Sequence, residues 1–244
     1  MAFNILVTND DGIASDGIRR LAEAAKEFGT VTVVAPASQC SAASHSITLN
    51  RTLEVHPYDF PVEGIRSFAC SGTPADCVRI GILNILKEKP AVVLSGINYG
   101  YNLANDIQYS ATLGAAFEAE FAGCPAIAFS EAAPIEATDE THGVSRHYLR
   151  EIMAEMIEKP YVAGQVWNVN FPGCPLEECK GILRDRTMSR QAFYEDHYQE
   201  IRTLPDGGME LEVKGVHKSA AEEGTDYAAI EAGWVSIGTV RNYC

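Results

Sequence analysis

Two adjacent carboxylates, Asp10 and Asp11, follow a short apolar run near the start of the chain. Two adjacent carboxylates repel each other and are tolerable if a cation lies between them, because hard divalent cations prefer carboxylate oxygens. Asn, Asp and Gly are also ordinary turn formers, so the segment 9–12 alone fits either a metal site or a solvated turn. No G-x-G-x-x-G fingerprint follows, which disfavours an NAD-dependent oxidoreductase. A haloacid-dehalogenase-like phosphatase would separate its two aspartates by one residue.

Two further polar segments contain groups that could join such a site. Residues 38–46, here called the serine loop, contain four hydroxyl groups and His45, and hydroxyl oxygens can complete a cation shell or donate to phosphate. In residues 95–112, two glycines permit backbone angles that could turn successive N–H groups toward one anion, and Asn98 could supply a neutral carbonyl oxygen. Ser110 has the position of a helix N-cap, whose positive end favours phosphate. Each segment alone also fits an ordinary polar loop.

Predicted strands and helices alternate along the chain, and they must position these polar segments. Apolar β-rich runs predict strands and amphipathic spacing predicts helices, so the pattern indicates a doubly wound, mostly parallel α/β sheet. The predicted strands are 4–8, 30–35, 53–56, 65–69, 91–94, 125–129 and 165–170, and the predicted helices are 15–28, 73–87, 110–122 and 147–158. Ligands bind at the carboxyl ends of parallel strands, where all three polar segments would begin. Beyond residue 173 we expect a smaller β-rich region with strands at 209–213 and 235–240.

The composition excludes several partners. The formal net charge of −14 argues against nucleic-acid polymers and anionic membrane surfaces, both of which require clustered basic residues. No secretory signal peptide or membrane-spanning run is evident, and the seven cysteines contain no C-x-x-C pair. We therefore expect a cytoplasmic protein with reduced thiols.

Taken together, the motifs resemble the SurE family, the survival-protein E nucleotidases. The resemblance covers most of the chain. It rests on ILVTNDDGI at 5–13, SITL at 46–49, GTPADCV at 72–78, SGINYGYN at 95–102, YSATLGAAFEA at 109–119, GTDYAAI at 224–230 and GWVSI at 233–237. It implies a Rossmann-like core (about 1–173) and a C-terminal oligomerisation region (about 174–244) within a single domain.

The resemblance also implies the chemistry. The family hydrolyses nucleoside monophosphates as a metal-dependent 5′- and 3′-nucleotidase, in some members also as an exopolyphosphatase, and forms homodimers or homotetramers. It implies one divalent cation, Mg²⁺ or Mn²⁺, per subunit, held by the ligand set Asp10, Asp11, Ser41 and Asn98. The chain departs from the family at Ala42, Ala104 and Ala111, where glycine is common; alanine would be strained there if the backbone needs a positive φ.

Our hypothesis is metal-assisted phosphomonoester hydrolysis with Asp10 and Asp11 as the catalytic residues. The residues expected to contact substrate or its phosphate are Asn9, Gly96, Asn102, Ser110 and Thr112. Attack by water and attack by Asp10 through a covalent aspartyl-phosphate both remain open. His45 as an acid and Tyr99 and Tyr101 as base-stacking groups also remain open. The alternative to an enzyme is a non-catalytic nucleotide- or metal-sensing module on the same scaffold.

Overall fold

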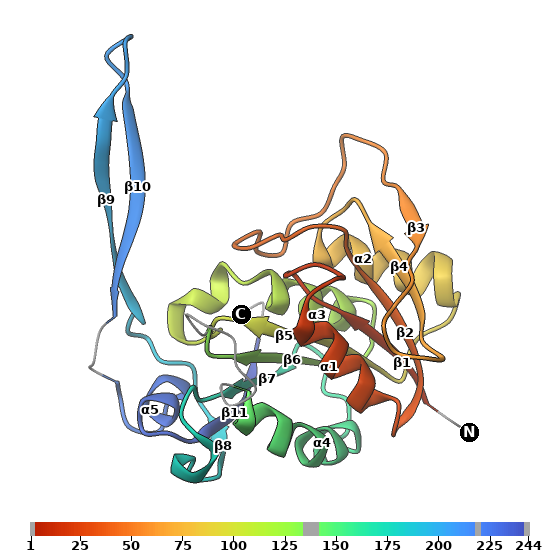
Figure 1. Ribbon diagram of the computed structural model, residues 1–244. Coiled ribbons are helices and arrows are strands. Elements are labelled where there is room, and N and C mark those ends of the chain that lie inside the picture. The colour runs from red at the N-terminus through yellow and green to blue at the C-terminus, as the bar shows by residue number, and fades with distance from the viewer. Residues whose placement is uncertain (1–2, 134–141, 218–220, 242–244) are drawn as a thin grey trace.

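The computed structural model describes residues 3–133, 142–217 and 221–241, and it confirms the predicted α/β class (Figure 1). One mixed sheet has the strand order β3-β4-β2-β1-β5-β6-β7-β11-β8, and a separate hairpin pairs β9 with β10. The strands are β1 Phe3–Thr8, β2 Gly29–Pro36, β3 Val55–Pro57, β4 Arg66–Cys70, β5 Val92–Tyr99, β6 Ala126–Glu131, β7 Val166–Phe171, β8 Ile182–Arg186, β9 Tyr194–Thr203, β10 Met209–His217 and β11 Val235–Val240. The five central strands β2, β1, β5, β6 and β7 are parallel to one another, and β11 joins β7 antiparallel.

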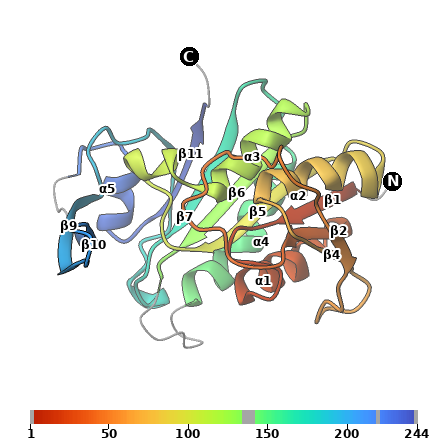
Figure 2. The same ribbon diagram turned by 90° about the horizontal axis from the view of Figure 1, so that it is seen from above.

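Helices cover both faces of this sheet, as the view in Figure 2 shows. The α-helices are α1 Asp16–Ala25, α2 Pro74–Ile80, α3 Ala111–Phe121, α4 Gly143–Ile157 and α5 Asp226–Glu231. Helices α1 and α4 pack on one face with Ile5 and Val7, whereas α2 and α3 pack on the other face with Leu6. Because alternate side chains of a strand point to opposite faces, the continuous apolar run of β1 supplies both cores. None of the helices in the described ranges is long and apolar enough to cross a membrane.

Two central segments differ from the sequence prediction. The helix predicted over 73–87 begins at a capping box, in which Thr73 and Asp76 satisfy each other's backbone N–H groups, but only α2 is regular. It continues as a π-helical segment, Gly81–Leu86. The region 95–108, predicted as one long loop, instead extends β5 to Tyr99 and then forms a 3₁₀ turn, Ala104–Gln108. The SGINYGYN segment at 95–102, here called the Gly/Asn motif, therefore begins on an irregular strand rather than in a free loop.

The C-terminal region differs more. Strands β8 and β11 belong to the main sheet. The sheet therefore includes residues beyond 173, where we expected the core to end. The prediction missed β8, β9 and α5, because these segments are short or lack apolar periodicity. The β9–β10 hairpin projects away from the sheet (Figure 1). Its exposed large apolar side chains are Tyr198, Ile201, Met209, Leu211, Val213 and Val216.

Two of the three alanine departures lie where the backbone favours glycine. Ala42 has φ 55° and Ala104 has φ 51°, both in the left-handed region. Ala111, in contrast, is the first residue of α3 and carries no such strain. The concern about strain therefore applies to Ala42 and Ala104, and the first of these lies next to Ser41.

We expect Ala42→Gly to stabilise the protein. Ala42 is exposed, so the substitution removes backbone strain without emptying a core position. The free energy of unfolding should rise by about 0.5–1 kcal/mol after the extra chain entropy of glycine is subtracted. Chemical denaturation of the two proteins measures this change. The matched control is Ala43→Gly at the next residue, which is not in the left-handed region and should lose about 0.5–1 kcal/mol; equal effects at the two sites would refute the strain argument.

Candidate active site

The candidate site lies where the sheet changes its winding direction. From β1 the chain proceeds to β2 on one side, and β5 lies on the other side of β1. The carboxyl ends of these neighbours carry the acidic pair, the serine loop and the Gly/Asn motif, and Thr8 pairs with Ser95 at the junction of β1 and β5. Such switch points form ligand-binding crevices in open α/β sheets. The topology therefore brings the three predicted polar segments to one edge.

Asp10 is buried at the end of β1 and faces the first turn of α3. Its side chain is 5% exposed, and Thr112 Oγ1 donates to Asp10 Oδ1 at 2.7 Å. Burial raises the pKa of Asp10 to about 7, the hydrogen bond from Thr112 opposes this shift, and the neighbouring Asp11 adds to it. Without a cation, this carboxyl group therefore carries a proton for much of the time near neutral pH.

Asp11 is half-buried and is held from the β5 side. The backbone N–H of Tyr99 donates to Asp11 Oδ2 at 3.0 Å, and Gln39 Nε2 lies 3.4 Å from Asp11 Oδ1. Burial raises the pKa of Asp11, and the hydrogen bonds from Tyr99 and Gln39 lower it. Asn98, one residue before Tyr99, donates its Nδ2 to the carbonyl of Gly100 at 2.8 Å, which leaves Oδ1 as its remaining polar atom.

The serine loop is tied to the same place through its backbone. The N–H of Cys40 donates to the carbonyl of Asp10 at 2.7 Å, which holds the loop backbone against Asp10 one residue before Ser41, whose side chain is exposed. Further along, Gly114 of α3 lets the loop pass closely, because a Cβ there would lie 2.4 Å from the carbonyl oxygen of Ser44. The loop thus crosses α3 between the candidate site and the later turns of that helix.

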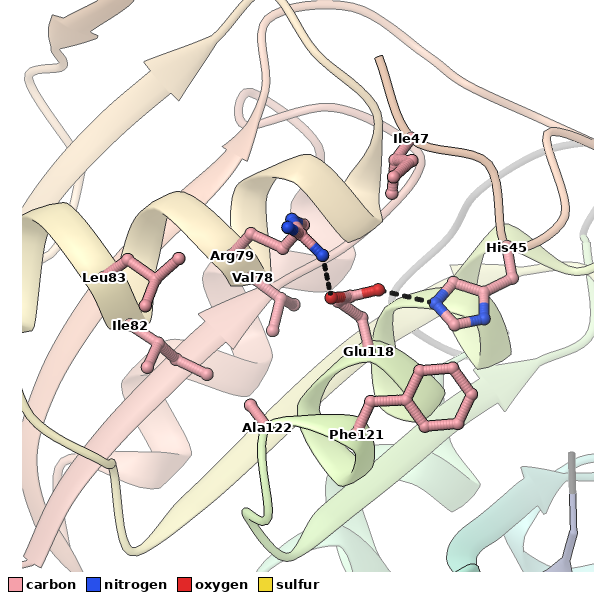
Figure 3. A pocket seen from close by; sticks show the side chains of 9 residues that line it. All are labelled: His45, Ile47, Val78, Arg79, Ile82, Leu83, Glu118, Phe121 and Ala122. Carbon is pink, nitrogen blue, oxygen red and sulfur yellow. Dashed lines mark hydrogen bonds and ion pairs between the residues drawn. The ribbon is translucent and has the colours of Figure 1, made fainter. Parts of the chain in front are cut away.

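His45 lies on the far side of this crossing. Figure 3 shows its ring directed toward Glu118, with 2.8 Å between Nε2 and Glu118 Oε2, and Arg79 Nη1 donates to the other Glu118 oxygen at 2.9 Å. These groups line a pocket of about 510 Å³ between α2 and α3, with Phe121 on its rim. The interactions with Glu118 anchor His45 in this pocket, so the geometry does not favour it as the acid for a leaving group.

The structure separates the predicted phosphate-binding residues into two sets. Thr112 contacts Asp10, and Ser110 caps α3, with its Oγ accepting from the N–H of Leu113 at 3.1 Å while its own hydrogen remains able to donate. Asn102 instead belongs to a buried hydrogen-bond network: its Nδ2 donates to Ser130 Oγ at 2.7 Å and its N–H donates to Asn170 Oδ1 at 2.9 Å.

Several of the backbone N–H groups expected to bind an anion already donate hydrogen bonds within the protein. The N–H of Tyr99 donates to Asp11, and that of Gly100 donates to the carbonyl of Glu131 at 2.9 Å. Together with Asn102, three amides of the segment 96–102 already have acceptors. Gly96 itself is required by packing, because a Cβ there would lie 2.3 Å from the carbonyl oxygen of Phe129. This segment therefore offers a phosphate group fewer backbone donors than the sequence suggested.

The donor set nevertheless fits a hard cation. Asn9 donates its Nδ2 to the carbonyl of Gly12 and to Ser15 Oγ, but its buried Oδ1 has no hydrogen-bond partner within the described residues. The same holds for the hydroxyl oxygens of Thr8 and Ser95, so unsatisfied oxygens gather where β1 meets β5. No group of three or more His, Cys, Asp or Glu side chains suited to a metal occurs in the described part of the chain. A site here would combine two carboxylates with neutral oxygens, a set typical of magnesium-like ions.

Sequence reasoning missed one group beside the site. Arg20 of α1 and Glu131 of β6 form a buried ion pair. Two signals were present in the sequence: an arginine between the apolar residues Ile18 and Leu21 of a helix, and a carboxylate at the carboxyl end of a predicted strand.

Several known proteins are similar to this chain over most of its length. Residues 5–194 match the family described as survival protein SurE. The chain is 39% identical to the 5′-nucleotidase SurE of Flavobacterium psychrophilum, over 97% of this chain and 91% of that protein. It is 38% identical to the 5′-nucleotidase SurE of Aeromonas hydrophila, over 96% and 90%. The crystal structure of the SurE protein from Aquifex aeolicus superposes with a TM-score of 0.81 at 34% identity and covers 98% of this chain and 93% of its own. The chain therefore belongs to the SurE family.

Proposed function

We propose that this protein is a metal-dependent nucleotidase that hydrolyses nucleoside 5′-monophosphates to nucleoside and inorganic phosphate. Relatives that match almost the whole chain are named 5′-nucleotidase SurE. The observation that carries the proposal is the acidic pair itself: a buried Asp10 and an adjacent Asp11 are both destabilised as charged groups, and a divalent cation would relieve both. Activity on 3′-monophosphates and on polyphosphate belongs to the same proposal.

In the proposed site, Asp10, Asp11, Ser41 and Asn98 hold one divalent cation, Mg²⁺ or Mn²⁺, per subunit. When bound, such an ion polarises a phosphate oxygen and lowers the pKa of water. Thr112 keeps the Asp10 carboxylate oriented, and the Tyr99 amide does the same for Asp11. Ser110 remains as a hydroxyl donor to phosphate at the N-terminus of α3.

We favour water over Asp10 as the nucleophile. Asp10 is almost completely buried, and one of its oxygens accepts the hydroxyl proton of Thr112. A carboxylate held in this way is poorly placed to approach a phosphorus atom in line, whereas a water molecule needs no movement of the protein.

We further propose that the protein assembles with copies of itself, as a homodimer or homotetramer. The β9–β10 hairpin supports this, because it presents six large apolar side chains to solvent away from the sheet. A surface of this kind is typical of protein–protein contacts.

The test of the function is phosphate release from a panel of nucleoside 5′- and 3′-monophosphates and polyphosphate, with Mn²⁺, Mg²⁺ or EDTA. We expect turnover of monophosphates with the metal ions and none with EDTA. Few chain donors are available to phosphate, so substrate binding should depend on the cation as well. Tight Mn²⁺ binding without turnover of any phosphomonoester would contradict the proposal and favour a sensing module.

A further inference from the structure

A buried polar cluster joins α1, β6 and α4, and its Glu131 lies close enough to Asp11 to help raise the pKa of Asp11. Arg20 is 7% exposed and Glu131 is 3% exposed, and the Arg20 guanidinium is paired with the Glu131 carboxylate. Ser145 completes the cluster, because its Oγ accepts from Arg20 Nη1 at 3.0 Å and donates to Glu131 Oε2 at 2.6 Å. Burying an ion pair usually adds little net stability, since desolvation offsets the attraction. Stability alone is therefore a weak explanation for this cluster.

Tyr99 connects the cluster to the candidate site. The Arg20 guanidinium lies near its phenol group: burial raises the pKa of Tyr99, and Arg20 opposes this shift. The Tyr99 ring stacks on His142, with 5.6 Å between the ring centroids and 11° between the planes. His142 in turn lies against the cluster, with 3.0 Å between its Nδ1 and Glu131 Oε1. The backbone N–H of the same tyrosine donates to Asp11 Oδ2. The side chain of Tyr99 is thus fixed from two directions while its amide holds a predicted metal ligand.

We propose that Arg20 is a positioning residue that, through Tyr99, holds the Asp11 carboxylate in its cation-binding orientation. The proposal rests on the metal site of the proposed function. The physical need for such a device is the repulsion between Asp10 and Asp11, which would turn Asp11 toward solvent if nothing restrained it. One hydrogen bond from a mobile backbone would restrain it weakly, whereas an amide fixed by Arg20 restrains it at a defined position.

Arg20 could affect cation binding through its charge or through its position, and the two explanations predict opposite changes in affinity when Arg20 is replaced. As a charge, Arg20 lies near the site and repels a cation, so replacing it with a neutral residue should strengthen cation binding. The loss of Arg20 would also remove the arginine charge that faces the Glu131 carboxylate, which adds to the negative potential. As a positioning residue, Arg20 supports cation binding, and its removal should weaken it. The direction of the change therefore separates position from charge.

The experiment is direct Mn²⁺ binding to the full-length protein, measured by calorimetry or by the paramagnetic resonance of free Mn²⁺. We expect Arg20→Gln to raise the Mn²⁺ dissociation constant about tenfold, the lower range for residues that orient metal ligands. Tyr99→Phe keeps the ring and the amide but removes the hydroxyl group near Arg20, and it should shift the constant in the same direction. Arg20→Lys keeps the charge without the planar fork and should restore only part of the affinity.

The matched control is Arg150→Gln. Arg150 on α4 pairs with Glu27, just beyond α1, in an exposed contact between the same two helical regions, so the substitution should leave Mn²⁺ affinity unchanged. If Arg20→Gln does not fold, Tyr99→Phe decides the question. Unchanged or tighter Mn²⁺ binding in Tyr99→Phe, or in a folded Arg20→Gln, would overturn the positioning role. A wild-type protein that binds no Mn²⁺ would instead overturn the proposed function, and with it this inference.

A kinetic measurement separates positioning from general destabilisation. In Arg20→Gln, the Mn²⁺ concentration for half-maximal activity should rise, while kcat at saturating Mn²⁺ should remain close to that of the wild type. A purely structural role predicts a lower melting temperature with an unchanged Mn²⁺ requirement.

Discussion

Asp10→Asn is expected to remove nearly all nucleotidase activity while the protein remains folded. The amide oxygen can still accept the Thr112 hydrogen bond, so the local structure should survive. The substitution removes one of the two anionic ligands, and with it most of the affinity for a divalent cation. A bound cation contributes several kcal/mol to catalysis, so kcat/KM should fall at least about a hundredfold. Phosphate release from a nucleoside monophosphate at fixed Mn²⁺ concentration measures the loss.

The control for this prediction is Asp59→Asn, an identical chemical change at an exposed position remote in sequence from the site. It should leave both kcat/KM and Mn²⁺ affinity at their wild-type values. Wild-type turnover together with wild-type Mn²⁺ affinity in Asp10→Asn would show that the metal site lies elsewhere.

The second large effect is a pH dependence of the metal-free protein. Burial raises the pKa of Asp10 from 3.8 to about 7, so between these values the folded state binds a proton that the unfolded state has released. The free energy of unfolding therefore falls as the pH rises from about 4 to about 7, by up to about 4 kcal/mol, and is flat with respect to this group above pH 7. Denaturation at several pH values in EDTA measures this slope.

Asp10→Asn isolates this contribution from the other carboxyl groups. The pKa of Asp11 is raised as well, whereas ion pairs lower the pKa of Glu155 and of others, so the total pH profile is a sum. The difference between the wild type and Asp10→Asn should change steadily up to about pH 7. Added Mn²⁺ should raise the melting temperature more at pH 7.5 than at pH 5.5, because the cation competes with the proton on Asp10. A pH-independent difference would contradict the raised pKa.

The parts of the site that sequence could predict are those where local pattern and chemistry coincide. A buried strand that ends in two aspartates places them at the carboxyl edge of a parallel sheet, and the structure has Asp10 and Asp11 there. Ser110 has the sequence position of an N-cap, and its Oγ makes the capping hydrogen bond of α3. These features depend on neighbours within a few residues, which is why a single sequence predicts them.

The features that sequence could not predict depend on distant partners. Asn102 resembles a loop residue available to substrate, yet its carbonyl oxygen accepts from Asn168 and Asn170 of β7, 66 and 68 residues away. Arg20 and Glu131 are 111 residues apart and meet because α1 packs against β5, the neighbour of β6 in the sheet. Hydrophobic periodicity does not indicate which polar side chain will be drawn into such a contact. For the same reason, the sequence pattern did not predict that β5 continues through Tyr99.

The β9–β10 hairpin has a consequence for how much of each subunit is folded on its own. A two-stranded ribbon is marginally stable in water by itself, and this ribbon keeps apolar side chains exposed along both strands. Its order must then come from whatever surface covers it. If that surface is another copy of the chain, dilution should melt the ribbon while the sheet and the acidic pair remain intact, so that protein concentration sets the length of ordered chain.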